Sequence, residues 1–161
     1  MTTAFVNWGE SRVKLTWEET SLLPANDFIT SAHGFCVKEN KLLLVNLCDR
    51  GWDFPGGHME PGERPVDCFK REALEEGYVA GDCELLGYIT VDHSENPAWT
   101  ENSRYPKIGY QVFYKMDIKE WLPFEGKHES VQRKLIDPTE VSLYYRNWHV
   151  VYQGILDCAL R

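Results

Sequence analysis

The stretch Gly56–Val79, GGHMEPGERPVDCFKREALEEGYV, decides the fold because it joins a glycine-rich turn to a helix of unusual charge. We expect the helix to begin near Pro65, since proline suits the first helical turn and has no N–H that would go unpaired there. Asp67 then places a negative charge in the first turn, where the helix dipole favours it. Gly77 is expected to end the helix, so the stretch predicts a loop, a helix and a second loop.

Three carboxylates lie on one side of this predicted helix. Glu72, Glu75 and Glu76 are spaced at i, i+3 and i+4, which brings their side chains together. Like charges at these spacings destabilise a helix by roughly 0.2–0.5 kcal/mol per pair. A divalent cation held through oxygen would neutralise the cluster, and Mg²⁺ commonly bridges carboxylates and substrate phosphates. A solvated acidic helix face is the alternative interpretation.

The spacing of the charged and glycine positions extends well beyond these three residues. Gly57 is followed by five residues and Glu63, and then by seven residues and the run Arg71-Glu72-Ala73-Leu74-Glu75-Glu76. This pattern closely resembles the Nudix box, the signature of the Nudix hydrolase family. The preceding Trp52-Asp53-Phe54-Pro55 also resembles the strand that leads into the box in that family.

One position departs from the family pattern. The box normally continues with any residue, a glycine and an aliphatic residue, whereas this chain has Gly77, Tyr78 and Val79. The glycine is therefore displaced by one position, and Tyr78 stands in its place. Because the change falls at the end of the helix, we expect a locally shifted cap and no loss of chemistry.

The resemblance implies a metal site and roles for the box residues. Glu72, Glu75 and Glu76 would be ligands of Mg²⁺, or of Mn²⁺ as a substitute, and the backbone carbonyl of Gly57 or Gly56 would be a further ligand. One of the carboxylates would position or deprotonate the attacking water. The remaining two charged positions of the box would support this site, with Arg71 orienting the glutamates and Glu63 bracing the loop against the helix.

The resemblance also implies an acidic residue from a loop after a late strand. Glu129 best matches that placement, and the rivals are Glu125, Glu101 and Glu95. Each of these also fits a solvated loop carboxylate. A polar segment at 92–106 is expected to form a loop over the site. Trp99 and Tyr105 in that loop are candidates for stacking on a base, and loop packing is the alternative.

Composition sets limits on the architecture and the partners. The 161 residues include 43% hydrophobic ones, enough for one ordinary core, so we expect a single domain with residues 1–27 as an extension or edge strand. The net charge of −8 argues against long nucleic acid but not against a small nucleotide held through a metal. No apolar run approaches the ~20 residues of a membrane span. Five cysteines without a CxxC pair suggest free thiols and a cytoplasmic location.

Hydrophobic patterning outside the box predicts strands and one further helix. The expected strands are 12–17, 28–37, 41–48, 83–91 and 108–118, and the expected polar connections are 92–106 and 120–134. Residues 42–45 are continuously apolar, as in a strand buried on both faces. Residues 146–160 have the spacing of an amphipathic helix. Together these elements indicate an α/β or α+β fold, and the Nudix resemblance implies an α/β/α sandwich with a mixed central sheet.

We therefore expect a Mg²⁺-dependent hydrolase that cleaves a pyrophosphate linkage in a nucleoside diphosphate joined to another group. Nucleoside triphosphates are the default substrate, since no further motif selects a narrower class. A non-catalytic nucleotide-binding or regulatory module on the same fold is the alternative. A Nudix-fold isomerase of isoprenoid diphosphates is disfavoured by the intact box. Trp8 and Trp17 are expected to pack in the fold, although they could instead cover a nucleobase or meet a second copy of the chain.

Overall fold

The computed structural model describes all residues from 1 to 161 and contains a nine-stranded mixed sheet. Its only parallel pair joins β3 and β8, and every other strand pair is antiparallel. The main path through the sheet runs in the order β1 (Thr2–Trp8), β2 (Ser11–Glu19), β7 (Val79–Asp92), β8 (Ile108–Trp121), β3 (Ile29–Lys38), β4 (Lys41–Leu47) and β5 (Gly51–Asp53). Two further strands leave this path, with β6 (Gly56–His58) on β3 and β9 (Ser130–Ile136) on β4.

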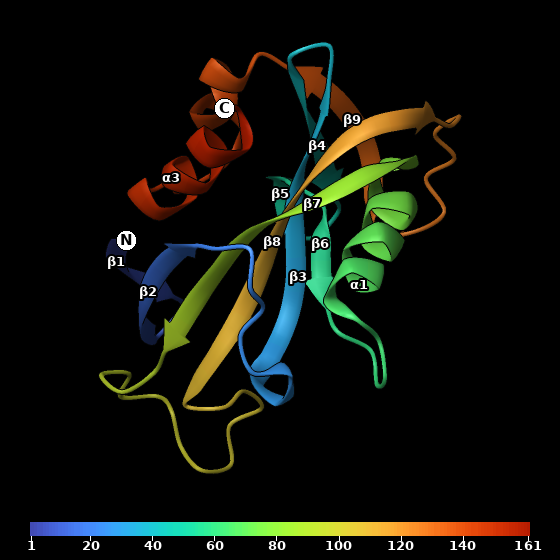
Figure 1. The fold of residues 1–161 in the computed structure, drawn as a ribbon. Helices are drawn as coiled ribbons and strands as arrows, with labels where there is room; N and C mark the ends of the chain where they lie inside the picture. The colour runs from blue at the N-terminus through green and yellow to red at the C-terminus, as the bar shows by residue number, and fades with distance from the viewer.

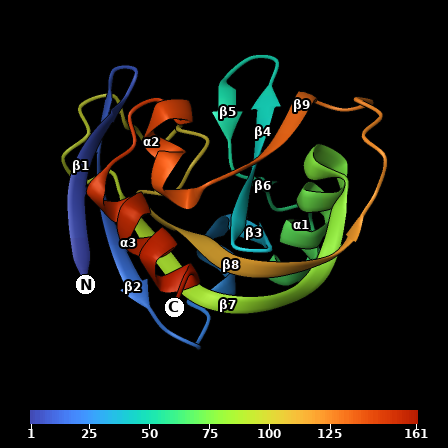
Figure 2. The same ribbon diagram turned by 90° about the horizontal axis from the view of Figure 1, so that it is seen from above.

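Two helices cover opposite faces of the sheet (Figure 1). Helix α1 (Pro65–Glu72) packs on one face, and helix α3 (Val150–Ala159) packs on the other, nearest β1 and β2. The view from above shows the curved sheet between them (Figure 2). The expected α/β/α sandwich with a mixed sheet is therefore confirmed. The remaining helical segments are short, namely α2 (Val141–Tyr144), 3₁₀ turns at Asn26–Phe28 and Pro138–Glu140, and a π-helical turn at Ala73–Gly77.

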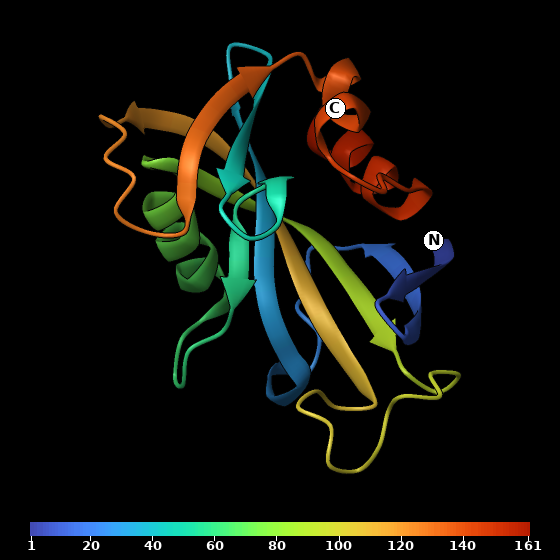
Figure 3. The same ribbon diagram turned by 180° about the vertical axis from the view of Figure 1, so that it is seen from behind.

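The core lies on both sides of β4, as the continuous apolar run predicts. Leu42 and Leu44 belong to the cluster beneath α3, whereas Leu43 and Val45 belong to the cluster beneath α1. All four side chains are completely buried. Successive side chains of a strand point to opposite faces, so this one strand anchors both helical layers. It is also flanked by β5 and β9, as the view from behind shows (Figure 3).

Strand β1 occupies one edge of the sheet. Two other segments differ from the sequence-based expectation. Strand β9 begins inside the expected polar connection 120–134 and extends to Ile136. It was not expected because only its two terminal residues, Ser130 and Ile136, are buried. Helix α3 begins at Val150, later than predicted, because His149 has extended backbone and its ring nitrogen accepts a hydrogen bond from the Tyr152 N–H. None of the helices has the length and apolar character needed to cross a membrane.

The box helix consists of α1 and the π-helical turn that continues it, Pro65–Gly77. Its close approach to β3 requires glycine at position 34. A Cβ atom there would lie 2.4 Å from the backbone oxygen of Tyr114 and 2.6 Å from Cζ of Phe69. We therefore expect Gly34→Ala to lower the free energy of unfolding by about 1–3 kcal/mol, the usual cost of overpacking a core. Urea denaturation monitored by tryptophan fluorescence measures this change.

Gly154→Ala is the matched control, because the nearest atom to a Cβ at this position in α3 is 3.7 Å away. Alanine in a helix interior is favoured over glycine by roughly 0.5–1 kcal/mol, so this variant should be as stable as the parent or more stable. Equal stabilities for the two variants would contradict the close packing inferred at Gly34.

Candidate active site

The box helix begins at Pro65 and its last helical residue is Gly77, both as predicted. From Ala73 to Gly77 the chain winds as a π-helical turn, and Tyr78 closes it with φ 54° and ψ 44°. The expectation of a shifted cap is wrong, because Tyr78 itself adopts the left-handed conformation that favours glycine. Gly77 is needed for another reason, because a Cβ there would lie 2.8 Å from Cδ2 of Leu43. Single π-helical turns occur frequently at functional sites.

Arg71 joins the glycine loop to the box helix. Its guanidinium donates two hydrogen bonds to Glu63, at 2.8 and 3.0 Å, and one to Oε1 of Glu72 at 2.8 Å. A further bond reaches the backbone oxygen of His58 at 3.2 Å. Hydrogen bonds from Arg71 hold the pKa of Glu63 down to about 2. The backbone N–H of Glu60 donates to the same carboxylate, at 3.0 Å, so the structure contains a braced loop at this position.

Glu76 is the most buried of the three box glutamates, at 3% exposed. One carboxylate oxygen accepts a hydrogen bond from the Gly56 N–H at 3.1 Å. Burial, reinforced by the nearby charges of Glu72 and Asp53, raises the pKa of Glu76 to about 8. The local environment therefore favours the neutral acid unless a positive charge is supplied.

Glu72 lies directly against the glycine loop. A Cβ at Gly57 would be 2.6 Å from the Glu72 carboxylate, so a larger residue cannot occupy position 57 without displacing it. Burial raises the pKa of Glu72, although the bond from Arg71 opposes this effect. Glu75 is the most exposed of the three, and its carboxylate lies 3.7 Å from Arg71.

These residues fit a hard divalent cation by their chemistry. The donors are carboxylate oxygens and the Gly56–Gly57 backbone, which are the ligand types that Mg²⁺ prefers. A cation would supply the positive charge that the buried Glu76 lacks. No three acidic, histidine or cysteine side chains already converge as a metal-holding group in the structure. The carboxylates instead have separate hydrogen-bond partners: Glu72 accepts from Arg71, and Glu76 accepts from the Gly56 N–H.

A cleft of about 600 Å³ opens beside these residues, and its lining includes Gly56, Gly57, Arg71 and Glu72. Of the four candidate late acids, only Glu129 lines it, with a carboxylate oxygen 3.6 Å from Arg50. The other three lie elsewhere, with Glu125 next to Lys127 and with Glu101 and Glu95 in the exposed 93–107 loop.

The 93–107 loop contributes one of its two candidate aromatic residues to the cleft. Tyr105 lines it and shares a 2.8 Å hydrogen bond with His58, with the two rings stacked 5.7 Å apart. Trp99 is not among the residues that line the cleft, and its ring N–H donates to the Tyr105 backbone oxygen at 3.0 Å. Trp99 thus helps to hold the loop that carries Tyr105.

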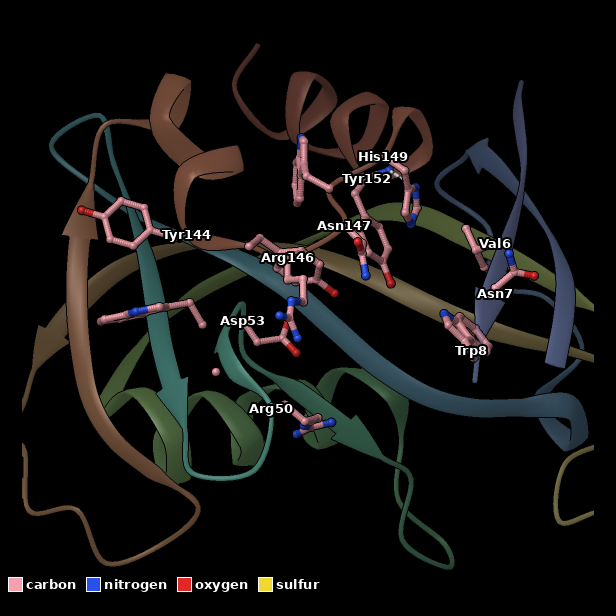
Figure 4. A pocket seen from close by; sticks show the side chains of 14 residues that line it. Val6, Asn7, Trp8, Arg50, Asp53, Tyr144, Arg146, Asn147, His149 and Tyr152 are labelled. Atoms are coloured by element: carbon pink, nitrogen blue, oxygen red, sulfur yellow. Dashed lines mark hydrogen bonds between the residues drawn. The ribbon is translucent and has the colours of Figure 1, made fainter. Parts of the chain in front are cut away.

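A second cavity, of about 970 Å³, adjoins the cleft and shares Trp8 and Arg50 with it. Figure 4 shows Asp53, Arg146 and Tyr152 pointing into its middle, opposite a wall that contains Trp8. Trp8 is 42% exposed and lines both cavities. Trp17, by contrast, is buried edge-on against Phe113, as expected.

Sequence reasoning missed the polar residues of this second cavity. Asp53 belongs to the stretch Trp52–Pro55, but nothing in that stretch indicates that its side chain lines a cavity. Its carboxylate accepts a 2.8 Å hydrogen bond from the Phe54 N–H, and burial raises its pKa to about 6. Arg146 and Asn147 come from the connection between α2 and α3, and no local pattern in that segment indicates a site.

The chain matches the NUDIX domain family model over residues 28–154. Because the match covers most of its length, the chain belongs to the Nudix family. No curated protein matches the chain.

Solved structures share the fold. The pyrophosphohydrolase BsRppH of Bacillus subtilis superposes with a TM-score of 0.72 at 20% identity, over 98% of this chain and 95% of that one. An ADP-ribose pyrophosphatase from Streptococcus suis gives 0.53 at 19% identity, over 81% and 87% of the two chains. A MutT structure from work on Aliivibrio salmonicida and Vibrio cholerae gives 0.55 at 15% identity, over 84% and 98%. At these identities the likeness shows the fold alone.

The Glu63–Arg71 pair should stabilise the protein in a pH-dependent way. Because the folded-state pKa of Glu63 is depressed to about 2, its contribution is present above the unfolded pKa of roughly 4.3 and is lost as the pH falls toward 2. We expect Glu63→Gln to lower the free energy of unfolding by about 2 kcal/mol at pH 7, as for hydrogen bonds to charged groups. Urea denaturation at pH 7, 5 and 3.5 should show this difference shrinking at the acid end.

Glu60→Gln provides the control, since the Glu60 carboxylate is exposed and 3.8 Å from Arg71. It should change stability by less than about 0.5 kcal/mol, as exposed ion pairs usually do. A Glu63→Gln effect that stays constant from pH 7 to pH 3.5 would contradict the assignment of the charge-dependent bond.

Proposed function

We propose that this protein is a Mg²⁺-dependent pyrophosphohydrolase, with Mn²⁺ as a substitute, that acts on a small nucleotide such as a nucleoside triphosphate. The observation that carries the proposal is the buried Glu76 carboxylate, which accepts a hydrogen bond from the Gly56 N–H. Gly56, Gly57 and Glu72 line the neighbouring cleft. The environment of Glu76 disfavours a bare negative charge and therefore favours a bound cation.

The box residues would have different roles in such a site. Glu72, Glu75, Glu76 and the Gly57 carbonyl would hold Mg²⁺, which neutralises phosphate oxygens and lowers the pKa of bound water. Arg71 would keep Glu72 in place through its 2.8 Å hydrogen bond. Glu129 lines the same cleft and is exposed, so it is placed to accept a proton from the attacking water or to orient it.

The second cavity supports a nucleotide over other diphosphates. Its lining combines aromatic rings with arginine and carboxylate side chains, including Trp8, Trp52, Arg50 and Asp53. Aromatic faces suit a base, and guanidinium groups suit phosphate. We infer that the nucleoside lies in this cavity and that its phosphates pass Arg50 to reach the cleft. Residues 1–27 would then act within the same domain as the box, since β1 supplies Trp8 to both spaces.

The structural neighbours and the composition also support a hydrolase that acts on a small nucleotide. Two of the structural neighbours are described as a pyrophosphohydrolase and an ADP-ribose pyrophosphatase, which supports cleavage of a pyrophosphate linkage without selecting a substrate. The net charge of −8 favours a small substrate over long nucleic acid. All five cysteines are free thiols, which we interpret as a cytoplasmic setting.

Turnover of a substrate panel with Mg²⁺ or Mn²⁺ tests the proposal. The panel should contain nucleoside triphosphates, oxidised deoxynucleotides, ADP-ribose, nucleotide sugars and dinucleoside polyphosphates, with products identified by mass. We expect Glu76→Gln, which removes a proposed metal ligand, to lower kcat/KM by roughly 10²–10⁴-fold, comparable to the loss of a general acid or base. The exposed Glu84→Gln on β7 should behave like the parent. Nucleotide binding without turnover by the parent protein would favour the non-catalytic binding module instead.

The Asp53 carboxylate should make nucleotide binding depend on pH. With a pKa of about 6, it is ionised above that pH and then accepts hydrogen bonds from N–H or O–H groups of the nucleoside. We therefore expect KM for the favoured substrate to fall as the pH rises from 5 to 7. Steady-state kinetics of Asp53→Asn should show a flattened KM profile, whereas Asp117→Asn, exposed on β8, should retain the parent profile. An unchanged profile in Asp53→Asn would remove this residue from the binding site.

A further inference from the structure

The segment between β8 and β9, residues 122–129, is tied to the end of the box helix through Tyr78. The Lys127 N–H donates to the Tyr78 hydroxyl at 2.9 Å, and the Leu122 N–H donates to the Tyr78 backbone oxygen at 2.9 Å. The Phe124 ring meets the Tyr78 ring edge-on at 5.0 Å. Tyr78 is 8% exposed, and this loop contacts both its ring and its hydroxyl.

Strand β9, which follows this loop, is also hydrogen-bonded to the final backbone groups of the box helix. Ser130, completely buried, donates to the Glu76 backbone oxygen at 2.6 Å. Arg133 donates to the backbone oxygens of Gly77 at 2.9 Å and Leu122 at 2.6 Å. Backbone oxygens at a helix end lack helical partners, and here β9 and the loop supply them. Glu129 immediately precedes Ser130, so its position is set by this junction.

The backbone and the side chain of Tyr78 have different roles: the backbone forms the helix cap, and the side chain contacts the loop. With φ 54° it occupies the region where glycine is strain-free, so glycine would form the same cap more easily. The ring and hydroxyl are what tyrosine adds. Both the hydroxyl hydrogen bond and the ring contact with Phe124 are made to the 122–129 loop.

We propose that Tyr78 is a positioning residue that couples the end of the box helix to the 122–129 loop. Through this coupling it fixes the position of Glu129, which lines the cleft, relative to the end of the box helix. The catalytic consequence rests on the function proposed above, because it requires Glu129 to act on the attacking water. The structural coupling is independent of that function.

Amide hydrogen exchange tests the coupling without any substrate. Tyr78→Phe removes only the hydroxyl that accepts the Lys127 N–H, so that amide should exchange roughly 2- to 10-fold faster, as for one lost hydrogen bond. Tyr78→Gly relieves the strained backbone and removes the ring as well, so exchange should rise over the whole 122–129 loop. The control is Tyr88→Phe on β7, whose hydroxyl donates to Glu18 instead. Parent-like exchange of the loop in both Tyr78 variants would overturn the proposal.

A double-mutant cycle with Glu129→Gln tests the catalytic consequence. Tyr78→Phe should lower kcat roughly 2- to 10-fold, the equivalent of one hydrogen bond, with KM unchanged. In the Glu129→Gln background the same substitution should change kcat by less than about twofold, because coupled residues are not additive. Equal effects in the two backgrounds would show a merely structural role and would reject the positioning of Glu129. If the parent shows no turnover with any substrate, the proposed function fails, while amide exchange still decides the coupling.

Discussion

The ion pair between Arg71 and Glu63 is the interaction on which the site depends. It connects the glycine loop, which has little side-chain packing of its own, to a helix that is anchored in the core through Phe69. The loop must lie close to the helix, because its backbone contacts Glu72 and donates to Glu76. A charged pair with two parallel hydrogen bonds fixes both distance and orientation. A single neutral bond would leave the loop free to rotate about it.

The box helix and the glycine loop are held in place because the helix packs closely against the sheet. Gly34 lets β3 approach the box helix closely, and Gly77 lets the end of the helix approach β4. Carboxylates on such a framework lose little further freedom when they bind a cation, which is the condition for a preorganised site. The burial of Glu76 is therefore a consequence of packing. Its cost is offset when a ligand supplies positive charge.

The sequence predicted those features that depend on local chemistry. Proline at the helix start, the spacing of the box charges and the apolar run in β4 each act within a few residues, and the structure contains the helix start and the β4 strand they predict. Features that depend on distant partners were not predictable. Strand β9 forms because β4 pairs with it, and the second cavity is lined by residues far apart in the sequence, such as Asp53 and Arg146. The cap was expected to shift, but Tyr78 adopts the left-handed conformation after Gly77, and its side chain has its partners far along the chain in the 122–129 loop.

The placement of Arg50 links the two halves of the proposed site. Its side chain borders both the cleft and the second cavity, and it lies 3.6 Å from Glu129. The box side of the cleft is strongly acidic and repels phosphate, so a phosphate chain entering it needs positive charge on the way. Arg50 is the cationic side chain common to both spaces. A nucleotide that occupies the second cavity would compete with Glu129 for this guanidinium. Binding would then free the Glu129 carboxylate from its contact with Arg50, within the cleft that it lines.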